Sequence, residues 1–276
     1  MSMTTSEIME LALKLAGQSE VPKDSAIYVD GEGIRKVLLG IDIDTAEVLL
    51  AKQLGADCVI SHHPTDAMMG WYNADAWQVY LDHIPMMVEF GIPEERARAA
   101  VIERAITFRE DYCNRNFDRV VSTCKLLGMP LMNIHKPLDH IGLMVMRQAV
   151  DSVLGNNASA TAQDLIDALD GIPEIKKGNS MRLAYGSPSQ KVRKAVVSHA
   201  CLGAPDHLVI KEYLSHGADA VICIKLDRQD AVSLGDIPGC VIVTGHIASD
   251  SIGINPLVSE LEKSGVEVLT VNGIIR

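Results

Sequence analysis

Two kinds of hydrophobic pattern alternate along this chain. Residues 5–16 carry apolar side chains at three- and four-residue steps after a Thr/Ser start, which predicts an amphipathic helix. Residues 37–43 and 58–61 are short, continuous apolar runs that predict buried strands, and residues 45–54 between them predict a helix with Asp44 as its cap. A strand, helix and strand in this order form a parallel pair with a right-handed crossover.

The same alternation continues to the end of the chain. Residues 93–127 have apolar residues at three- and four-residue steps between charges, which is typical of one long helix or two in sequence. Shorter helices are expected at 143–154 and 162–169, and further strands at 131–134, 194–198, 220–224, 241–244 and 266–271. The polar stretch 171–180, rich in helix breakers, is expected to be a linker or an exposed loop. The pattern as a whole predicts an α/β fold.

A short motif occurs twice, each time before a predicted strand. The segments LLAKQLGADCVIS, from Leu49, and IKEYLSHGADAVIC, from Ile210, share Gly-Ala-Asp at the same distance from the strand. An internal duplication would produce this echo, but so would the chance recurrence of helix, glycine turn and strand in an α/β protein. The sequence alone leaves both explanations open.

Length and charge limit the classes of protein that the chain can form. The chain has 276 residues, of which 47% are hydrophobic, so it is long enough for one large domain or two modest ones. Its formal net charge is −11 and its isoelectric point is near 5.2. Proteins that bind the nucleic-acid backbone rely on clustered Lys and Arg, so this charge argues against a nucleic-acid partner.

The cysteines and the first residues predict a cytoplasmic protein. The six cysteines are scattered without a Cys-x-x-Cys pair, and Cys58, Cys223 and Cys240 sit in or beside apolar runs, so buried free thiols are favoured over disulfides or a zinc role. The first residues lack the basic start and the unbroken apolar stretch of a signal peptide. No apolar run approaches the ~20 residues that a membrane helix needs, so no membrane association is expected.

The candidate chemistry lies where predicted strands end. His62 and His63 directly follow the apolar run that ends at Ser61, and Pro64 fixes the chain after them. Sites in open α/β sheets form at the carboxyl ends of the strands. Neighbouring residues on an extended chain point to opposite sides, so this pair suits two metal ions, or one ion and a supporting role, better than chelation of a single ion. The alternative is a pair of histidines that bond to core carbonyl groups.

A second candidate pair follows the strand expected at 241–244. His246 comes directly after Gly245, and Asp250 is four residues further on. A helix that begins near His246 would place the imidazole and the carboxylate on one face, within reach of one ion. Alternatively, Asp250 caps the helix that follows it.

A third candidate group, His135, Asp139 and His140, follows the short strand expected at 131–134. Pro137 argues against a regular helix through this segment, so the spacing does not define its geometry. Three strand ends that carry His or Asp exceed what nine randomly placed histidines would give. Together, the three groups predict an intracellular site for one or two divalent metal ions.

These motifs resemble those of the Nif-three-like proteins, also known as the GTP cyclohydrolase I type two family. The resemblance runs through GIDIDTAEVLLAKQLGADCVISHHP, IHKPLDH, TAQDLIDAL and VIVTGHIASDSIG, so it covers most of the chain. It implies two α/β lobes with a dinuclear metal site at the cleft between them. It also implies assembly into a homo-oligomer such as a hexameric ring.

The resemblance assigns roles to individual residues. His62 and His63 match the family's paired histidines, Asp139 matches its mid-chain carboxylate, and His246 matches its late histidine. Asp250 stands where the family has a glutamate that bridges two metals. The segment DAVICIKLDRQ lacks the Gly-Glu pair that follows the family's second-lobe strand, so chemistry that needs this pair does not transfer.

The shared site also predicts how the chain divides into lobes. Residues 1–151 and 240–276 are expected to form the first lobe, with the strand at 266–271 in its sheet, and residues 152–239 are expected to form an inserted second lobe. Because metal–ligand bonds are only about 2.0 to 2.2 Å long, His62 and His246 must lie within about 10 Å of each other.

Three functions compete on this basis. The first is a metal-dependent hydrolase that activates water for attack on a small substrate, with His135 and His140 as proton shuttles or orienting groups. A nucleotide-like substrate is implied by the family resemblance alone. The second is a non-catalytic metal-binding or metal-delivery protein that acts through partners; His and carboxylate ligands accept zinc, iron, manganese, cobalt or nickel. The third, a metal-free module for a dinucleotide or a phosphate, is disfavoured because neither a GxGxxG nor a GxxxxGK motif occurs.

Overall fold

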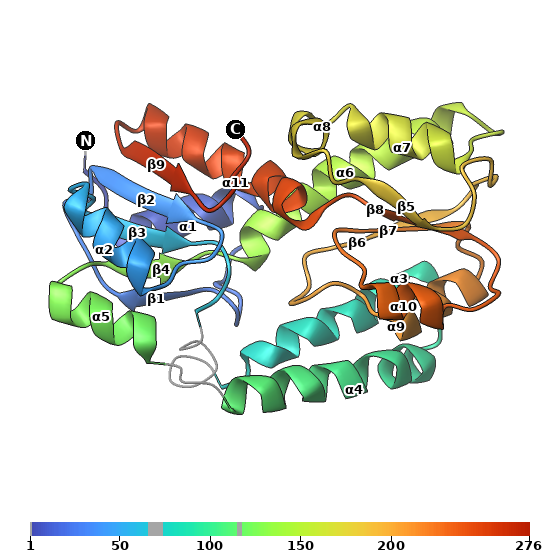
Figure 1. The fold of residues 1–276 in the computed structure, drawn as a ribbon, viewed down its shortest axis with the longest axis horizontal. Coiled ribbons are helices and arrows are strands. Elements are labelled where there is room, and N and C mark those ends of the chain that lie inside the picture. Colours follow the sequence, from blue (N-terminus) through green and yellow to red (C-terminus); the bar gives the residue numbers. More distant parts are fainter. Residues whose placement is uncertain (1, 66–73, 115–117) are drawn as a thin grey trace.

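The computed structural model describes residues 2–65, 74–114 and 118–276 and shows an α/β protein with two sheets (Figure 1). The two sheets lie at opposite ends of the molecule, and two helices run between them. Helices cover both faces of each sheet, as expected when parallel strands are joined by helical crossovers. The predicted α/β class with two lobes is confirmed.

The first sheet has five strands in the order β1-β4-β3-β2-β9. Its strands are β1 Ala26–Val29, β2 Lys36–Gly40, β3 Cys58–Ser61, β4 Leu131–Asn133 and β9 Glu267–Val271. The pair β1 and β4 is antiparallel and the other pairs are parallel; the pairing of β9 with β2 confirms that the last strand joins this sheet. Leu38 and Leu39 on β2 lie in two different hydrophobic clusters, one on each face. Burial on both faces explains why these strands read as continuous apolar runs.

The second sheet has four strands in the order β5-β8-β7-β6. Its strands are β5 Arg182–Tyr185, β6 Ala195–Ser198, β7 Ala220–Cys223 and β8 Cys240–Val243. Strands β6, β7 and β8 are parallel, and β5 is antiparallel to β8. The strands β2, β3, β4, β6, β7, β8 and β9 all fall where the hydrophobic pattern predicts them.

The helices connect these strands and begin at strong sequence signals. They are α1 Thr5–Leu15, α2 Thr45–Gln53, α3 His83–Phe90, α4 Glu94–Cys113, α5 Arg119–Leu127, α6 Lys136–Asn156, α7 Ala162–Asp170, α8 Pro173–Gly178, α9 His207–Ser215, α10 Arg228–Ser233, α11 His246–Lys263 and a 3-10 helix, η2 Ala76–Asp82. Thr4, Asp44 and Thr161 form capping boxes at the starts of α1, α2 and α7. These caps satisfy backbone N–H groups that have no partner inside the helix.

The pairing of the strands differs from the expected division into lobes. Strand β8 lies in the range 240–276 that was assigned to the first lobe, but it pairs with β5 and β7 in the second sheet. Helices α3 and α4 precede residue 152, yet they pack with α9 beside the second sheet (Figure 1). The chain therefore passes between the two sheets more often than the ranges 1–151, 152–239 and 240–276 assume.

Two local predictions were wrong, and proline is the reason in both. Helix α6 begins at Lys136 and includes Pro137, because the first turn of a helix needs no backbone N–H from that residue. The stretch 171–180, expected to be a linker, contains α8, which begins at Pro173 and buries Ile175. In each case proline starts a helix rather than preventing one.

Four strands of the first sheet have the same order as the four strands of the second sheet, and β9 has no counterpart. The order β1-β4-β3-β2 corresponds to β5-β8-β7-β6, and the first strand of each set is antiparallel to its neighbour. Asp57 and Asp219, from the two Gly-Ala-Asp motifs, each accept hydrogen bonds from two backbone N–H groups at or just before the start of the neighbouring strand. The shared order and shared contacts favour an internal duplication over a chance echo.

Helices α6 and α11 cross at very short range between the two sheets (Figure 1). A Cβ atom at Gly253 of α11 would lie 1.9 Å from the carbonyl oxygen of Leu138 in α6. A Cβ atom at Gly142 would lie 3.1 Å from the carbonyl oxygen of Ser249. The glycines therefore allow the two backbones to touch, which no residue with a side chain would permit at Gly253.

Two further expectations concern thiols and membranes. Cys58, Cys124, Cys201, Cys223 and Cys240 are buried free thiols, as expected, whereas Cys113 is exposed. Among the helices that the structure describes, none has the length and apolar character needed to cross a membrane.

We expect Gly253→Ala to lower the free energy of unfolding by about 1–3 kcal/mol or more, because the new methyl group meets backbone that a rotamer change cannot move. Gly155→Ala in α6 is the matched control, since nothing lies within 4 Å of its Cβ position. Alanine there should stabilise the helix by up to about 1 kcal/mol. Urea denaturation followed by circular dichroism measures both; similar effects at both positions would contradict a tight crossing.

Candidate metal centre

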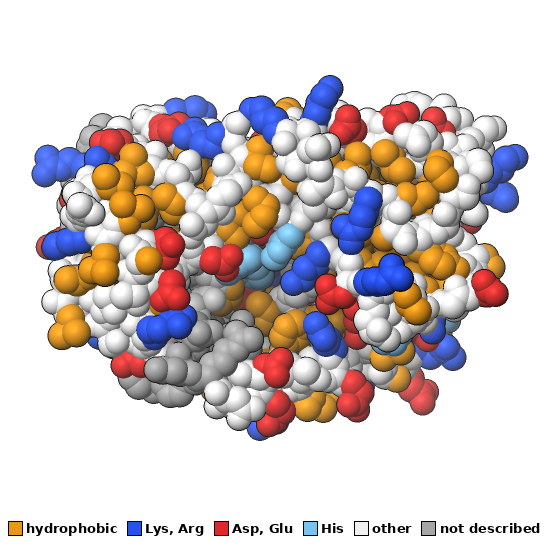
Figure 2. Space-filling view, in the orientation of Figure 1, with side chains coloured by type: hydrophobic (Ala, Val, Ile, Leu, Met, Phe, Trp, Pro, Cys, Tyr) orange, Lys and Arg blue, Asp and Glu red, His pale blue; other side chains and the backbone are white. Residues whose placement is uncertain are grey.

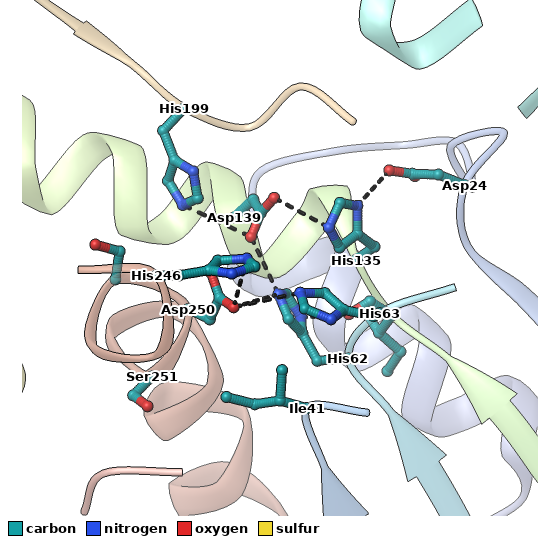
Figure 3. A network of polar contacts seen from close by, with 12 residues as sticks. Asp24, Ile41, His62, His63, His135, Asp139, His199, His246, Asp250 and Ser251 are labelled. Atoms are coloured by element: carbon teal, nitrogen blue, oxygen red, sulfur yellow. Dashed lines mark hydrogen bonds and ion pairs between the residues drawn. The ribbon is translucent and has the colours of Figure 1, made fainter. Parts of the chain in front are cut away.

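The predicted residues other than His140 meet at the carboxyl ends of the first sheet's strands and at the starts of two helices (Figure 3). His62 and His63 follow β3, and His135 follows β4. Asp139 lies in the first turn of α6. His246 is the first residue of α11, and Asp250 lies one turn later on the same face, as the i, i+4 spacing predicts.

The carboxylate of Asp250 is at the centre of the cluster. Its Oδ2 atom lies 3.4 Å from His63 Nε2, 3.4 Å from His246 Nε2 and 3.8 Å from His62 Nε2. The side chain is 1% exposed. Because His62 and His246 contact the same oxygen atom, the expectation that they lie close together is confirmed.

The carboxylate of Asp139 forms the second half of the cluster. Its Oδ1 atom lies 3.2 Å from His62 Nε2 and 3.6 Å from His199 Nε2, and its Oδ2 atom lies 3.4 Å from His135 Nε2. His62 therefore lies between the two carboxylates and contacts both.

Neighbouring acceptors orient three of the imidazole rings. The Nδ1 atom of His62 lies 3.1 Å from the carbonyl oxygen of Ile134, that of His63 lies 2.7 Å from Asp42 Oδ1, and that of His135 lies 2.6 Å from Asp24 Oδ2. If each Nδ1 donates its proton to these acceptors, each Nε2 is left with a lone pair that faces the cluster. This is how proteins orient histidines that bind metals.

Several buried atoms of the cluster have no hydrogen-bond partner among the described residues. They are His62 Nε2, Asp139 Oδ1, His199 Nε2 and Asp250 Oδ2. A buried polar atom without a partner is costly, so such atoms mark places where a ligand or ion belongs. Three groups of residues each offer ligand atoms that lie within 4.8 Å of one another. They are His62 with His63 and His135, His63 with His246 and Asp250, and His62 with Asp139 and Asp250. The buried His and Asp groups could therefore hold a metal ion.

The pKa values reflect how closely acids and imidazoles are packed. Burial lowers the pKa of His63, but the nearby carboxylates of Asp250 and Asp42 outweigh this and raise it to about 10. Burial lowers the pKa of His246 to about 4, although Asp250 opposes the shift. Burial would raise the pKa of Asp139, but the surrounding imidazoles hold it below its usual range. The cluster thus contains ionised carboxylates at neutral pH, as metal ligands must be.

Two details of the site differ from the sequence-based alternatives. His62 and His63 do not point to opposite sides: their ring centroids are 5.2 Å apart and both rings reach Asp250, because β3 ends at Ser61 and the extended geometry ends with it. Asp250 is not a helix cap, since it lies inside α11, whose N-cap is Gly245.

His140 lies outside this cluster. It is half-buried and lines a separate cavity of about 880 Å³ together with Lys136 and Arg147. Burial and the charges of Arg147 and Lys136 lower the pKa of His140. Successive helix residues point about 100° apart, so Asp139 faces the cluster while His140 faces away.

Three residues of the site were not predicted from the sequence. His199 follows β6 and is 4% exposed, so it brings a buried imidazole from the second sheet to Asp139. Asp24 and Asp42 hold the rings of His135 and His63 from outside. His199 could have been found, because it also stands directly after a predicted strand.

The cluster opens onto a cavity of about 310 Å³ between the two lobes. His63, His135, Asp139 and His246 line one part of it. Figure 2 shows histidine side chains in the middle of this face of the molecule, with acidic side chains on one side and basic side chains on the other. A small molecule can therefore reach the cluster from solvent.

Two α/β lobes with a buried His and Asp cluster at the strand ends define a two-lobed protein with a candidate metal site. Its fold and sequence are similar to a NIF3 superfamily protein from Sphaerobacter thermophilus, with 36% identity over 98% of each chain and a TM-score of 0.93. The chain belongs to the NIF3 superfamily, which confirms the family resemblance seen in the sequence motifs.

Other solved structures share the fold at lower identity. Reduced HcgD from Methanocaldococcus jannaschii is 14% identical, with 98% of each chain covered and a TM-score of 0.57. The protein ybgI is 18% identical, with 98% of each chain covered and a TM-score of 0.56. No protein-family model and no curated protein matches the sequence.

We expect the metal-free protein to lose stability as the pH rises from about 6.5 to about 10. His63 has a pKa near 6.5 when unfolded and about 10 when folded, so its contribution is complete below 6.5 and disappears as the pH passes the folded value. Denaturation of chelator-treated protein at pH 6, 8 and 10 measures this loss. His63→Gln should reduce the slope, and an unchanged slope would contradict the shift.

Proposed function

We propose that this protein binds one or two divalent metal ions through His62, His63, Asp139, His246 and Asp250. The observation that carries the proposal is the buried Asp250 Oδ2 atom, which faces three imidazole nitrogens and has no hydrogen-bond partner among the described residues. A cation is the species that satisfies a carboxylate oxygen and several imidazole lone pairs at once. The residue types also fit, because zinc, iron, manganese, cobalt and nickel all accept His and carboxylate ligands.

A second ion is supported by the way the ligand groups overlap. The set His63, His246 and Asp250 and the set His62, Asp139 and Asp250 share one carboxylate. A carboxylate that bridges two ions offsets part of their repulsion. His135 and His199 both reach Asp139, so they can complete or orient the coordination on that side.

We further propose that the protein is a metal-dependent hydrolase. A bound divalent ion would polarise the substrate and lower the pKa of a water molecule at the site. His135 lines the cavity, its Nε2 atom faces Asp139, and its Nδ1 atom bonds to the buried Asp24. These contacts support a role for His135 in taking a proton from the site. His140 is farther from this chemistry because it lines the other cavity.

The alternative is a non-catalytic protein that stores or delivers metal through partners. The cavity beside the cluster favours a hydrolase, because a carrier does not need a small-molecule cavity next to its metal. Metal-dependent hydrolysis of a panel of nucleotides and phosphate esters separates the two functions. Hydrolysis that is lost in Asp139→Asn supports an enzyme, whereas metal binding without hydrolysis of any compound supports a carrier.

Three finer features belong to the same proposal. The volume of the cavity suits a small substrate, and family resemblance supports a nucleotide-like one. The resemblance also supports a homo-oligomer such as a hexameric ring, which light scattering coupled to size-exclusion chromatography would detect. The free buried cysteines are consistent with the reducing environment of the cytoplasm.

We expect His63→Ala to lower metal affinity by about tenfold or more while the protein stays folded, because His63 lies beyond the end of β3 and adds little to the apolar core. Elemental analysis of protein purified without a histidine tag measures the metal-to-protein ratio. His216→Ala is the control, since His216 is the C-cap of α9 and its Nδ1 atom lies 2.8 Å from the backbone oxygen of Glu212. Equal metal content in wild type and His63→Ala would remove His63 from the site.

We expect Asp250→Asn to lose bound metal and Asp250→Glu to keep or gain it. Asparagine preserves the shape of the side chain but not the charge that offsets two cations, whereas glutamate adds reach for a bridge. Metal analysis with thermal melts compares the two variants. If Asp250→Asn retains the full metal content, the carboxylate does not hold the ion.

A further inference from the structure

The cavity beside the metal cluster has a second wall that comes from the repeated half of the chain. In the first sheet, Ile134 donates a backbone hydrogen bond to Ser61, and in the second sheet Thr244 donates the matching bond to Cys223. These bonds align Ser61 at the end of β3 with Cys223 at the end of β7. His63 and Lys225 each lie two residues further along, so their positions correspond. Both residues line the cavity. One half of the repeat therefore presents an imidazole to the cavity, and the other presents an ammonium group.

A second cation reaches the cavity from helix α4. Arg104 and Phe108 lie one helical turn apart and both line the cavity. The guanidinium carbon of Arg104 lies 5.1 Å from the centre of the Phe108 ring, which keeps the two side chains together. The ring also packs on the backbone of Gly203, where a Cβ atom would lie 2.7 Å from Phe108 Cζ. Phe108 thus provides a fixed apolar surface beside the charge.

In the part of the chain that the structure describes, Arg104 and Lys225 form no ion pair, and both side chains are open to solvent. Four of the five acids that line the cavity already have partners. Asp42 contacts His63, Asp139 contacts His62 and His135, Asp206 accepts bonds from the N-terminus of α9, and Asp230 contacts His207. Asp227 remains as a counter-charge on this wall.

We propose that this wall binds the anionic group of a small phosphate ester, with Lys225 and Arg104 holding the phosphate and Phe108, Leu202 and Leu226 contacting an apolar or aromatic body. This proposal rests on the proposed function of the metal site and names its substrate class. Arginine and lysine recognise phosphate through charge-assisted hydrogen bonds, and the half-buried ring of Phe108 offers an aromatic edge or face that suits contact with a base. The cavity of about 310 Å³ is at the lower end of the range for small-molecule sites, so it fits a monomeric compound rather than a polymer.

Calorimetric titration of the metal-loaded protein with AMP, adenosine, ribose 5-phosphate and inorganic phosphate tests this proposal. We expect AMP to bind at least about tenfold more tightly than adenosine, and this advantage to shrink as salt is added. Lys225→Met and Arg104→Met should each weaken AMP binding by about tenfold or more and leave adenosine binding and metal content unchanged. Lys176→Met, on the exposed face of α8 and away from the cavity, is the matched control and should change nothing.

The outcomes separate this proposal from the proposed metal-dependent hydrolase. If AMP, ribose 5-phosphate and inorganic phosphate all fail to bind at millimolar concentrations, or bind equally to wild type and to both cavity variants, the cationic wall has no such role. If removal of metal abolishes AMP binding while Lys225→Met and Arg104→Met bind normally, the phosphate contacts the metal and the proposal is wrong. Charge-dependent AMP binding without hydrolysis would support this proposal and count against the hydrolase.

Discussion

The backbone contact between α6 and α11 determines where the two buried carboxylates lie. Helix α6 starts at a strand end of the first sheet and packs on the second, whereas α11 starts at a strand end of the second sheet and packs on the first. They touch at Leu138 and Gly253. Asp139 follows Leu138 directly and Asp250 precedes Gly253 by one turn, so each helix delivers a carboxylate beside the crossing. Side chains from strand ends of both sheets then complete the cluster.

Without a bound cation, this cluster of buried charges lowers the stability of the folded protein. Burying ionised groups is costly unless each has a partner, and several nitrogen and oxygen atoms of the cluster have none in the described structure. Attraction between Asp139 and the surrounding imidazoles offsets part of this cost, as the lowered pKa of Asp139 shows. Features that weaken a core in this way are common at functional sites, where geometry serves chemistry rather than stability. A bound divalent ion would satisfy the unpaired atoms together.

The sequence predicts the parts of this structure that depend on local pattern. The buried strands follow from continuous apolar runs, and the pairs at His62 and His246 follow from strand ends and helical spacing. Strands β1 and β5 were missed because they are four-residue edge strands that are only partly buried, and β5 also begins with an exposed arginine. His199 stands directly after β6 and so carried the same signal as His62, whereas Asp24 lies in a distant segment that no periodicity marks. The division into lobes failed at β8 because strand pairing is a long-range property.

The structural repeat allows the two walls of the cavity to carry different residues. If each half of the chain had been a separate, identical subunit, any substitution at a strand end would have altered both walls of the shared cavity together. In a single chain the two copies mutate independently, so the position after β3 holds histidine while its counterpart after β7 holds lysine. A duplicated chain can therefore carry different chemistry on the two walls of one pocket, here an imidazole on one wall and an ammonium group on the other.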